Sequence, residues 1–170
     1  VKNIMSSKSL EPYVIELEEK TGVATIVNQL SSQDFTGQQV VRRYFINQFV
    51  QAASGYDPKT YRIDYDKVRL LSTPAVFNDF RNRINAKELG AEASIEVRIK
   101  SIQFPTQNTA QIRILKQITL PDTSPKNKDE IITMDFYFAP EMNLTMEERL
   151  INPLGFQVSK YLVAEEVFTY

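Results

Sequence analysis

Carboxylates and phenols gather between residues 61 and 66, where the sequence is Tyr-Arg-Ile-Asp-Tyr-Asp. In a pocket, such groups exchange protons with a substrate, as an isomerase or dehydratase requires. On a helix, however, Asp64 and Asp66 point about 200° apart, so their carboxylates cannot meet at one substrate. Asp64 is also placed to pair with Arg62 or Lys67. The spacing therefore favours solvated surface charge over acid–base catalysis.

The composition removes most other catalytic chemistry. The 170 residues contain neither cysteine nor histidine, which excludes thiol nucleophiles, histidine general bases and the usual zinc, copper and iron ligand sets. The sequence also has no nucleophile elbow and no phosphate-binding loop. Twenty basic and twenty-one acidic residues give a net charge of -1, which predicts neither nucleic-acid binding nor a basic membrane-binding surface. We therefore expect no catalytic residues, no cofactor and no metal.

Three alternating runs between residues 91 and 138 predict the centre of the fold. In each run apolar side chains alternate with polar ones, which is the period of a strand with one buried face. Polar breaks at residues 105–108 and 121–128 favour antiparallel neighbours, because parallel strands need a long crossover. The predicted inward side chains are Ala93, Ile95, Val97 and Ile99, then Ala110, Ile112, Ile114, Ile118 and Leu120, then Ile132, Met134, Phe136 and Phe138.

A fourth strand is predicted near the C-terminus. Its inward side chains are Phe156, Val158, Leu162 and Ala164. Lys116 and Lys160 interrupt the inward pattern of their strands, and a buried lysine without a partner is costly. A β-bulge that turns each lysine outward is the favoured explanation. The alternatives are an open part of the concave face or an ion pair, with acidic candidates Asp135, Glu165 and Glu166.

Helical periodicity dominates the chain before the sheet. A long helix is predicted over residues 36–53, and Gly55 and Pro58 end it. Its core face consists of Val41, Phe45, Ile46, Phe49, Ala52 and Ala53. A second helix is predicted over residues 59–71, and a third begins at Pro74 after a Ser-Thr cap and reaches Ile84.

Two smaller elements complete the prediction. Residues 12–18 and 23–27 flank Lys-Thr-Gly and are predicted to form a short hairpin. A short helix is predicted over residues 145–152, with Thr145 and Glu148 at capping-box spacing. With 42% hydrophobic residues, the chain can bury one core as a single domain. Helices first and antiparallel strands afterwards indicate an α+β domain with its helices on one face of the sheet.

Two groups of residues are candidates for binding. Val40 and Tyr44 lie opposite the core face of the long helix, so they either form a partner surface or are covered by flanking helices or by the hairpin. Asn152, Pro153, Leu154 and Gly155 form the second group. Proline fixes φ and glycine permits positive φ, so a tight turn that leads into the last strand is the favoured role. Direct partner binding by the Asn152 amide is the alternative.

Three stretches resemble a known family. Residues 152–163, Asn-Pro-Leu-Gly-Phe-Gln-Val-Ser-Lys-Tyr-Leu-Val, resemble the NPxG signature of the inner-membrane scaffold subunit of bacterial type IV secretion systems (VirB subunit eight family), in its periplasmic domain. Residues 44–57 resemble the long first helix of that family, and residues 64–74 resemble the next two helices. The resemblance covers roughly residues 12–167. One departure is clear, because Ala53 and Ser54 stand where the family often has an Arg-Glu pair.

The resemblance implies a nuclear-transport-factor-two-like (cystatin-like) fold, with the long helix and shorter helices packed on a curved four-stranded antiparallel sheet. It also implies a non-catalytic component that forms a homodimer and contacts other channel subunits. The matching self-association candidates are Val41, Tyr44 and Glu166, to which the outer helix face adds Val40. The rival hypotheses are a small-ligand-binding protein or isomerase/dehydratase-like enzyme on the same fold, and a soluble adaptor of another nuclear-transport-factor-like branch.

The same resemblance implies a location. The family is anchored in the bacterial inner membrane by one N-terminal span and projects this domain into the periplasm. Because the sequence begins with valine, we expect it to be a fragment that follows such a span. Residues 1–9 are then a tether, and residues 10–170 are a single periplasmic assembly domain.

Overall fold

The first elements that the structure describes are two short paired strands. The computed structural model describes residues 15–17, 24–26 and 31–168, and the chain divides into two compact units, residues 1–46 and 47–170. In the first unit, β1 (Ile15–Leu17) and β2 (Ala24–Ile26) pair antiparallel, with Ile15 opposite Ile26. These strands confirm the predicted hairpin. Its connecting residues and the predicted tether at residues 1–9 lie outside the described residues.

Helix α1 (Ser31–Ser54) begins ahead of its predicted start at residue 36. The additional residues include serine and aspartate, two residue types that favour the first turn of a helix, where free N–H groups and the positive end of the dipole are exposed. The helix ends before Gly55, as predicted. A Cβ at Gly55 would lie 2.7 Å from the Gln51 carbonyl oxygen, so this glycine is needed for space at the helix end.

In the second unit, three shorter helices follow α1: α2 (Tyr61–Leu71), α3 (Pro74–Arg83) and α4 (Ala86–Leu89). Pro74 occupies the first turn of α3, as predicted. The predicted serine–threonine cap is wrong, however, because the Thr73 side chain makes no capping hydrogen bond and the Ser72 hydroxyl donates to the Val68 carbonyl of the preceding helix. Helix α4 was not predicted; the Asn85 side chain caps it by accepting from the Lys87 N–H.

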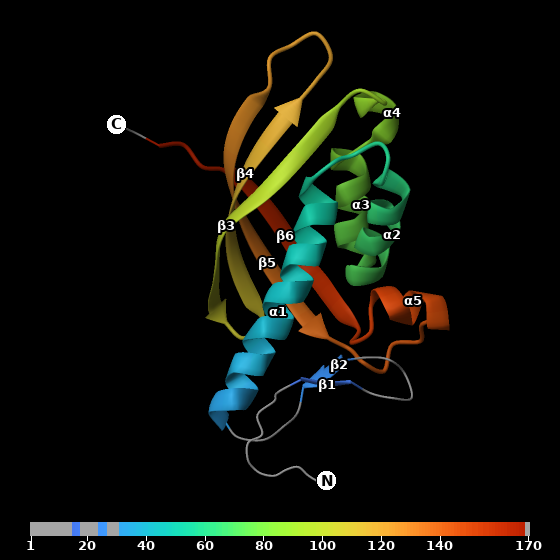
Figure 1. Cartoon of the computed structure of the whole chain (residues 1–170), viewed down its shortest axis with the longest axis vertical. Helices are drawn as coiled ribbons and strands as arrows, with labels where there is room; N and C mark the ends of the chain where they lie inside the picture. The colour runs from blue at the N-terminus through green and yellow to red at the C-terminus, as the bar shows by residue number, and fades with distance from the viewer. Residues whose placement is uncertain (1–14, 18–23, 27–30, 169–170) are drawn as a thin grey trace. The chain divides into compact units, whose positions relative to one another are not determined.

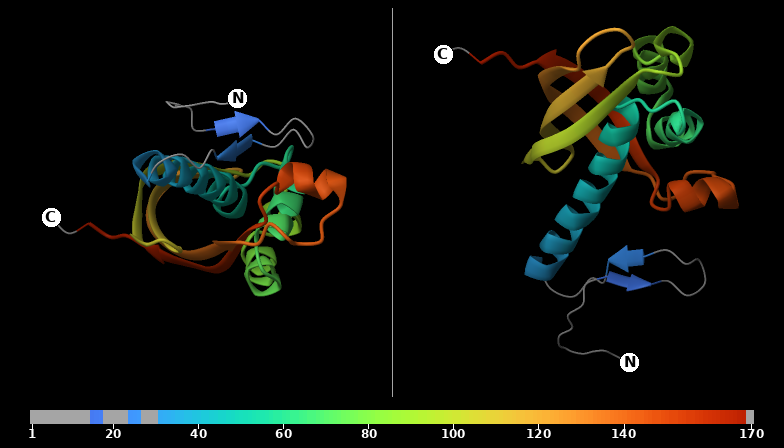
Figure 2. Two further views of the ribbon diagram at one scale, coloured as in Figure 1. Left: turned by 90° about the horizontal axis from the view of Figure 1, so that it is seen from below. Right: turned by 45° about the horizontal axis from the view of Figure 1, so that its top comes forward.

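The second unit also contains the predicted four-stranded antiparallel sheet, in the order β3-β4-β5-β6. Its strands are β3 (Ser94–Thr106), β4 (Thr109–Thr119), β5 (Lys126–Phe138) and β6 (Phe156–Glu165). The sheet is strongly curved, and α2 and α3 lie beside β6 (Figures 1 and 2). Each strand joins its sequence neighbour, so the sheet is a meander, as the short polar breaks predicted.

The core of the second unit lies on the inward face of this sheet. The fully buried strand side chains are Ala110, Ile112, Ile114, Ile132, Met134, Phe156 and Val158, and the helices add Phe49, Val50, Ala53, Val68, Leu71 and Phe80. These strand positions are those of the predicted alternation. The Phe49 ring meets the Tyr161 ring edge to face, with the ring centroids 5.1 Å apart. Burial of side chains of this size is the main stabilising term in a domain of this length.

A bulge in β6 changes the predicted pattern of the last strand. Lys160 lies opposite Asp135, but Val158 lies opposite Phe136, so Ser159 is the extra residue. Lys160 is consequently exposed, which confirms the prediction that a bulge turns it outward. Beyond the bulge the parity is inverted, and Tyr161 is buried. The predicted inward positions of Leu162 and Ala164 are therefore wrong, since both side chains are exposed.

Lys116 is accommodated by an ion pair and not by a bulge. β4 pairs with β5 without a register shift, so Lys116 stays on the inward parity, and the favoured bulge is wrong at this position. Its ammonium group lies 3.2 Å from a carboxylate oxygen of Glu130, which is not among the predicted acidic candidates. Both side chains are largely buried. This internal ion pair avoids the cost of a lone buried charge.

Candidate interaction surfaces

The turn at residues 152–155 is held by hydrogen bonds from the Asn152 side chain. Asn152 is fully buried, and its amide nitrogen donates to the carbonyl oxygens of Leu70, at 2.8 Å, and Phe156, at 3.0 Å. Its side-chain oxygen accepts from the Phe156 N–H at 2.8 Å. The amide is thus engaged with the backbone of its own chain, which favours the fold role over direct contact with a partner.

Gly155 is required at this turn by both conformation and space. Its φ is 67°, in the left-handed region that favours glycine. A Cβ at this position would lie 1.9 Å from the carbonyl oxygen of Ala139, and the Ala139 N–H in turn donates to the Gly155 carbonyl at 2.8 Å. The backbone of residue 155 therefore packs directly against the end of β5. Pro153 and Leu154, between these two anchors, are half-buried.

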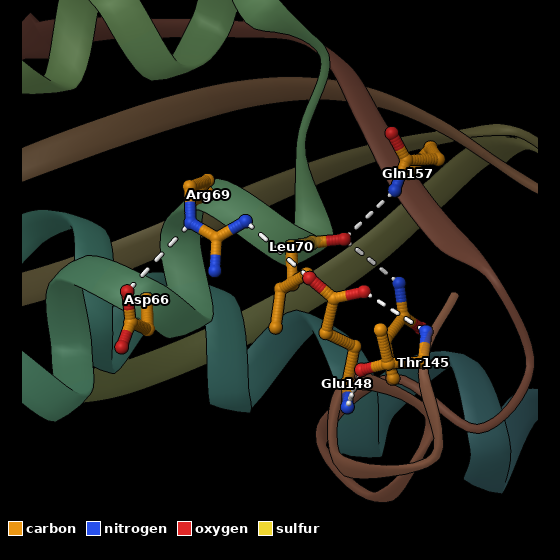
Figure 3. A network of polar contacts seen from close by, with 7 residues as sticks. Asp66, Arg69, Leu70, Thr145, Glu148 and Gln157 are labelled. Carbon is orange, nitrogen blue, oxygen red and sulfur yellow. Dashed lines mark hydrogen bonds and ion pairs between the residues drawn. The ribbon is translucent and has the colours of Figure 1, made fainter. Parts of the chain in front are cut away.

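The same turn fixes the end of α2. The Leu70 carbonyl lacks a helical partner in the last turn of α2, and it accepts from two side-chain amides, those of Asn152 and Gln157. Next to it, the Thr73 N–H donates to the Val158 carbonyl at 3.0 Å. Figure 3 shows Gln157 reaching Leu70 from β6. The turn thereby joins α2, the α2–α3 junction and β6.

Helix α5 (Met146–Ile151) precedes the turn and has the predicted capping box. The Thr145 hydroxyl accepts from the Glu148 N–H at 3.1 Å, and the Glu148 carboxylate accepts from the Thr145 N–H at 3.0 Å. Arg69 bridges α2 and α5, at 3.6 Å from Asp66 and 3.7 Å from Glu148 (Figure 3). These ion pairs are solvent-exposed, so they orient α5 more than they stabilise it.

Glu148 gives this region a dependence on pH. The hydrogen bond from the Thr145 N–H is the main cause that lowers the Glu148 pKa below its usual value of 4.5. The folded state thus favours the charged carboxylate, and this stabilisation is present above pH 4.5 and is lost as the pH falls through the lower pKa of the folded state. We expect Glu148→Gln to reduce the loss of stability between neutral and acidic pH, measured by urea unfolding across that range. The exposed neighbour variant Glu147→Gln is the control; an equal reduction there would contradict the assignment.

The outer face of α1 is exposed where the sequence predicted it. In the first unit, the exposed fractions of Val40 and Tyr44, which lie one turn apart, are 49% and 58%. Phe45 and Ile46, on the predicted core face, are buried, and Val41 is half-buried between the two faces. The Tyr44 ring meets the Phe45 ring edge to face at 5.2 Å. Val40 and Tyr44 thus offer an apolar and an aromatic side chain to solvent.

Glu166 is placed differently from these residues. In the second unit its carboxylate pairs with the Arg113 guanidinium of β4, and its N–H donates to the Asp129 carbonyl of β5 at 2.8 Å. Only 12% of its side chain is exposed. Glu166 therefore links the end of β6 to β4 and β5. A common surface of Glu166 with Val40, Val41 and Tyr44 stays a prediction.

The predicted acid–base cluster has structural partners. Burial raises the pKa of Asp64, whose carboxylate accepts from the Thr60 hydroxyl at 3.0 Å. Of the two predicted partners, Lys67 acts on this carboxylate, and its positive charge partly offsets the rise in pKa. Burial also raises the pKa of Tyr61, whose hydroxyl donates to the Ile84 carbonyl at 3.3 Å. Asp66 pairs with Arg69. Two of these contacts are local to α2, and the Tyr61 hydroxyl links α2 to the end of α3. They do not favour the isomerase or dehydratase alternative.

One buried polar network escaped the sequence analysis. The hydroxyls of Ser54 and Tyr161 share a hydrogen bond of 2.6 Å. The Arg83 guanidinium donates to the Ala53 carbonyl at 2.9 Å and lies over the Tyr161 ring, 5.4 Å from its centroid. Burial raises the pKa of Tyr161 far above its usual value, so its hydroxyl stays protonated. The network joins the end of α1 to α3 and β6 through the Ala-Ser pair that departs from the family pattern.

Two features are absent from the described residues. Among those residues, no three acidic side chains are grouped so that they could hold a metal ion. Within the described part of the chain, none of the helices combines the length and the apolar character that crossing a membrane requires.

A curved four-stranded antiparallel meander beside a long helix and shorter helices defines a nuclear-transport-factor-two-like α+β protein. A solved structure of VirB8 from Agrobacterium tumefaciens has this fold, with a TM-score of 0.69 and 20% identity over 85% of this chain and 100% of that one. The TrwG component of a type IV secretion system from Bartonella birtlesii is more similar in sequence, at 31% identity with a TM-score of 0.71 over 77% of this chain and 94% of that one.

The sequence itself identifies the family. The family described as VirB8 protein matches residues 1–166. The type IV secretion system protein PtlE of Bordetella pertussis is 31% identical over 98% of this chain and 74% of that protein. The chain therefore belongs to the VirB8 family of type IV secretion system components, as the NPxG resemblance predicted.

Proposed function

We propose that this chain is the periplasmic, non-catalytic assembly domain of a type IV secretion system, which self-associates as a homodimer and docks other channel subunits. The self-association surface consists of Val40, Val41 and Tyr44 on α1, with Glu166 at the end of β6 as a further candidate. The observation that carries this proposal is the exposure of Val40 and Tyr44 on one face of a helix in a family of secretion components. Exposed tyrosines are enriched at the energetic centres of protein interfaces.

The edges of the sheet support a helical interface over strand pairing. An exposed edge strand invites pairing with another chain unless bulges, lysines or prolines disrupt it. β6 has its bulge at Ser159 beside the exposed Lys160, and β3 has register shifts on either side of residues 101–103, with Lys100 and Pro105 along it. Both edge strands thus have features that oppose pairing with a strand of another chain. We therefore propose that contacts form through side chains on helix surfaces.

The proposal includes how this domain is attached to the membrane. One span upstream anchors the protein in the bacterial inner membrane, residues 1–9 form the tether, and residues 10–170 form one periplasmic assembly domain. The near-neutral charge supports protein partners over nucleic acid. No cofactor enters the proposed mechanism, which is recognition between protein surfaces.

Single cysteines test the proposed dimer directly, because the sequence contains none. We expect Tyr44→Cys, or Val40→Cys one turn away, to give a disulfide-linked dimer under mild oxidation. Ile63→Cys, at an exposed apolar position on α2, is the matched control and should remain monomeric. Cross-linking of Ile63→Cys at the same rate as Tyr44→Cys, or no cross-linking at either α1 position, would contradict the proposal.

A further inference from the structure

Helix α5 presents its apolar side chains to solvent. Met146 is 82% exposed and Leu150 is 72% exposed, one helical turn apart, and Ile151 beside them is 41% exposed. None of the six residues of this helix is buried. We call these three side chains the α5 ridge.

Two of the three polar side chains of α5, Glu148 and Arg149, face the protein, whereas Glu147 is exposed. With its apolar side chains exposed as well, α5 differs from the usual surface helix, whose apolar face is buried. Glu148 bonds the Thr145 N–H and lies near Arg69 of α2. Arg149 donates to the carbonyl oxygens of Pro140 and Met142 in the preceding loop. The contacts that hold α5 are therefore polar, and its apolar residues contribute little to the fold of the chain itself. A contiguous apolar surface of this kind marks a site of interaction.

The ridge is also held rigidly. Ile151 leads directly into Asn152, whose buried amide is fixed by three hydrogen bonds, and Thr145 fixes the other end of the helix through the capping box. A surface that is ordered before binding loses less conformational entropy when a partner arrives. The Asn-Pro-Leu-Gly turn thus positions the helix that precedes it.

The charge beside the ridge selects the kind of partner. Residues 141–151 contain three glutamates, at 141, 147 and 148, and one arginine, which is turned into the loop. Glu147, between Met146 and Leu150 in sequence, is exposed. A second copy binding through the same ridge would place glutamate beside glutamate, and an anionic membrane surface would be repelled. A segment with apolar side chains flanked by lysine or arginine is complementary to this surface.

We infer that the α5 ridge docks an amphipathic, basic-flanked segment of another secretion subunit. This inference rests on the proposed function and assigns its subunit docking to residues other than the self-association candidates on α1. The ridge spans less than two helical turns, which suits a small, transient contact that forms and releases during assembly.

The methyl group of Met146 reports binding directly. The probe is a short synthetic helical peptide with a leucine stripe flanked by lysines, and its counterpart has glutamates in place of the lysines. Both are titrated into the chain labelled at its methionine methyl groups and followed by NMR. We expect the lysine peptide to shift the Met146 resonance in low salt, with weaker binding in high salt, and to leave the buried Met134 unchanged. Leu150→Gln should weaken this binding roughly tenfold.

The following outcomes would contradict the inference. Equal shifts with the glutamate peptide, or none with the lysine peptide, would remove the charge complementarity or the site. A Met146 shift on raising the protein concentration alone would assign the ridge to a second copy, and broadening by anionic lipid vesicles would assign it to a membrane. Tyr44→Arg should leave the peptide titration unchanged, so failure of the ridge and failure of the proposed dimer are distinguishable.

Discussion

Gly155→Ala is expected to destabilise the protein by roughly 3 kcal/mol or more, because the new methyl group meets a backbone atom in a conformation that alanine disfavours. The φ of 67° alone disfavours a side chain, and a Cβ would lie 1.9 Å from the Ala139 carbonyl oxygen. Relief would require β5 to separate from the turn, and the hydrogen bond from the Ala139 N–H to the Gly155 carbonyl would be lost. Urea unfolding measures the change in the free energy of unfolding.

Gly90→Ala is the matched control. Gly90 also has positive φ, at 85°, but a Cβ there would have no neighbouring atom within 4 Å. With a ψ of -173° its backbone lies in a region that only glycine normally occupies, so its substitution should cost only the conformational strain, roughly 1–3 kcal/mol. A loss at Gly155 no larger than that at Gly90 would show that β5 yields to the new methyl group and that the turn is not the rigid joint described above.

Glu130→Ala is expected to lower the free energy of unfolding by about 3–5 kcal/mol, since it leaves Lys116 largely buried without its partner. The ammonium and carboxylate groups of this pair are 3.2 Å apart on the inward face of the sheet. Replacing both residues, as Lys116→Met with Glu130→Leu, should restore most of the loss, because no buried charge then remains. Thermal and urea unfolding of the unmodified chain, Lys116→Met, Glu130→Leu and the double variant give the coupling energy of the pair.

The neighbouring pair of Lys100 and Asp129 is the control for the buried one. Its side chains are about 30% exposed, and Asp129→Ala should cost less than about 1 kcal/mol. Similar losses for Asp129→Ala and Glu130→Ala would contradict the assignment of Lys116 and Glu130 as the internal ion pair that the fold depends on.

The features that the sequence predicted correctly are encoded locally. The alternation from Ala110 to Ile114 and the capping box of Thr145 and Glu148 each lie within a few residues, so period and spacing are sufficient to find them. The exposure of Tyr44 followed from its angle to Phe45 and Phe49 on one helix. The family resemblance added the name of the fold and the self-association candidates Val41 and Glu166.

The features that were missed depend on neighbouring strands and loops. The bulge at Ser159 inverts the parity of β6 and buries Tyr161, and only the pairing with β5 reveals it. The partner of Lys116 is Glu130 on β5, a diagonal neighbour that residue spacing along β4 cannot identify. The sequence predicted glycine at position 155 only because of the φ that the turn requires. The close approach of Ala139 is a tertiary contact, which the local sequence does not reveal.

The central claim is self-association through the outer face of α1. Analytical ultracentrifugation of the chain over a wide concentration range, beside Tyr44→Arg and the control Ile63→Arg, tests it most directly. We predict a reversible dimer for the unmodified chain and for Ile63→Arg, and a folded monomer for Tyr44→Arg, because a buried arginine without a partner opposes the contact. A strict monomer for all three proteins, or a dimer that Tyr44→Arg leaves intact, would contradict the proposal.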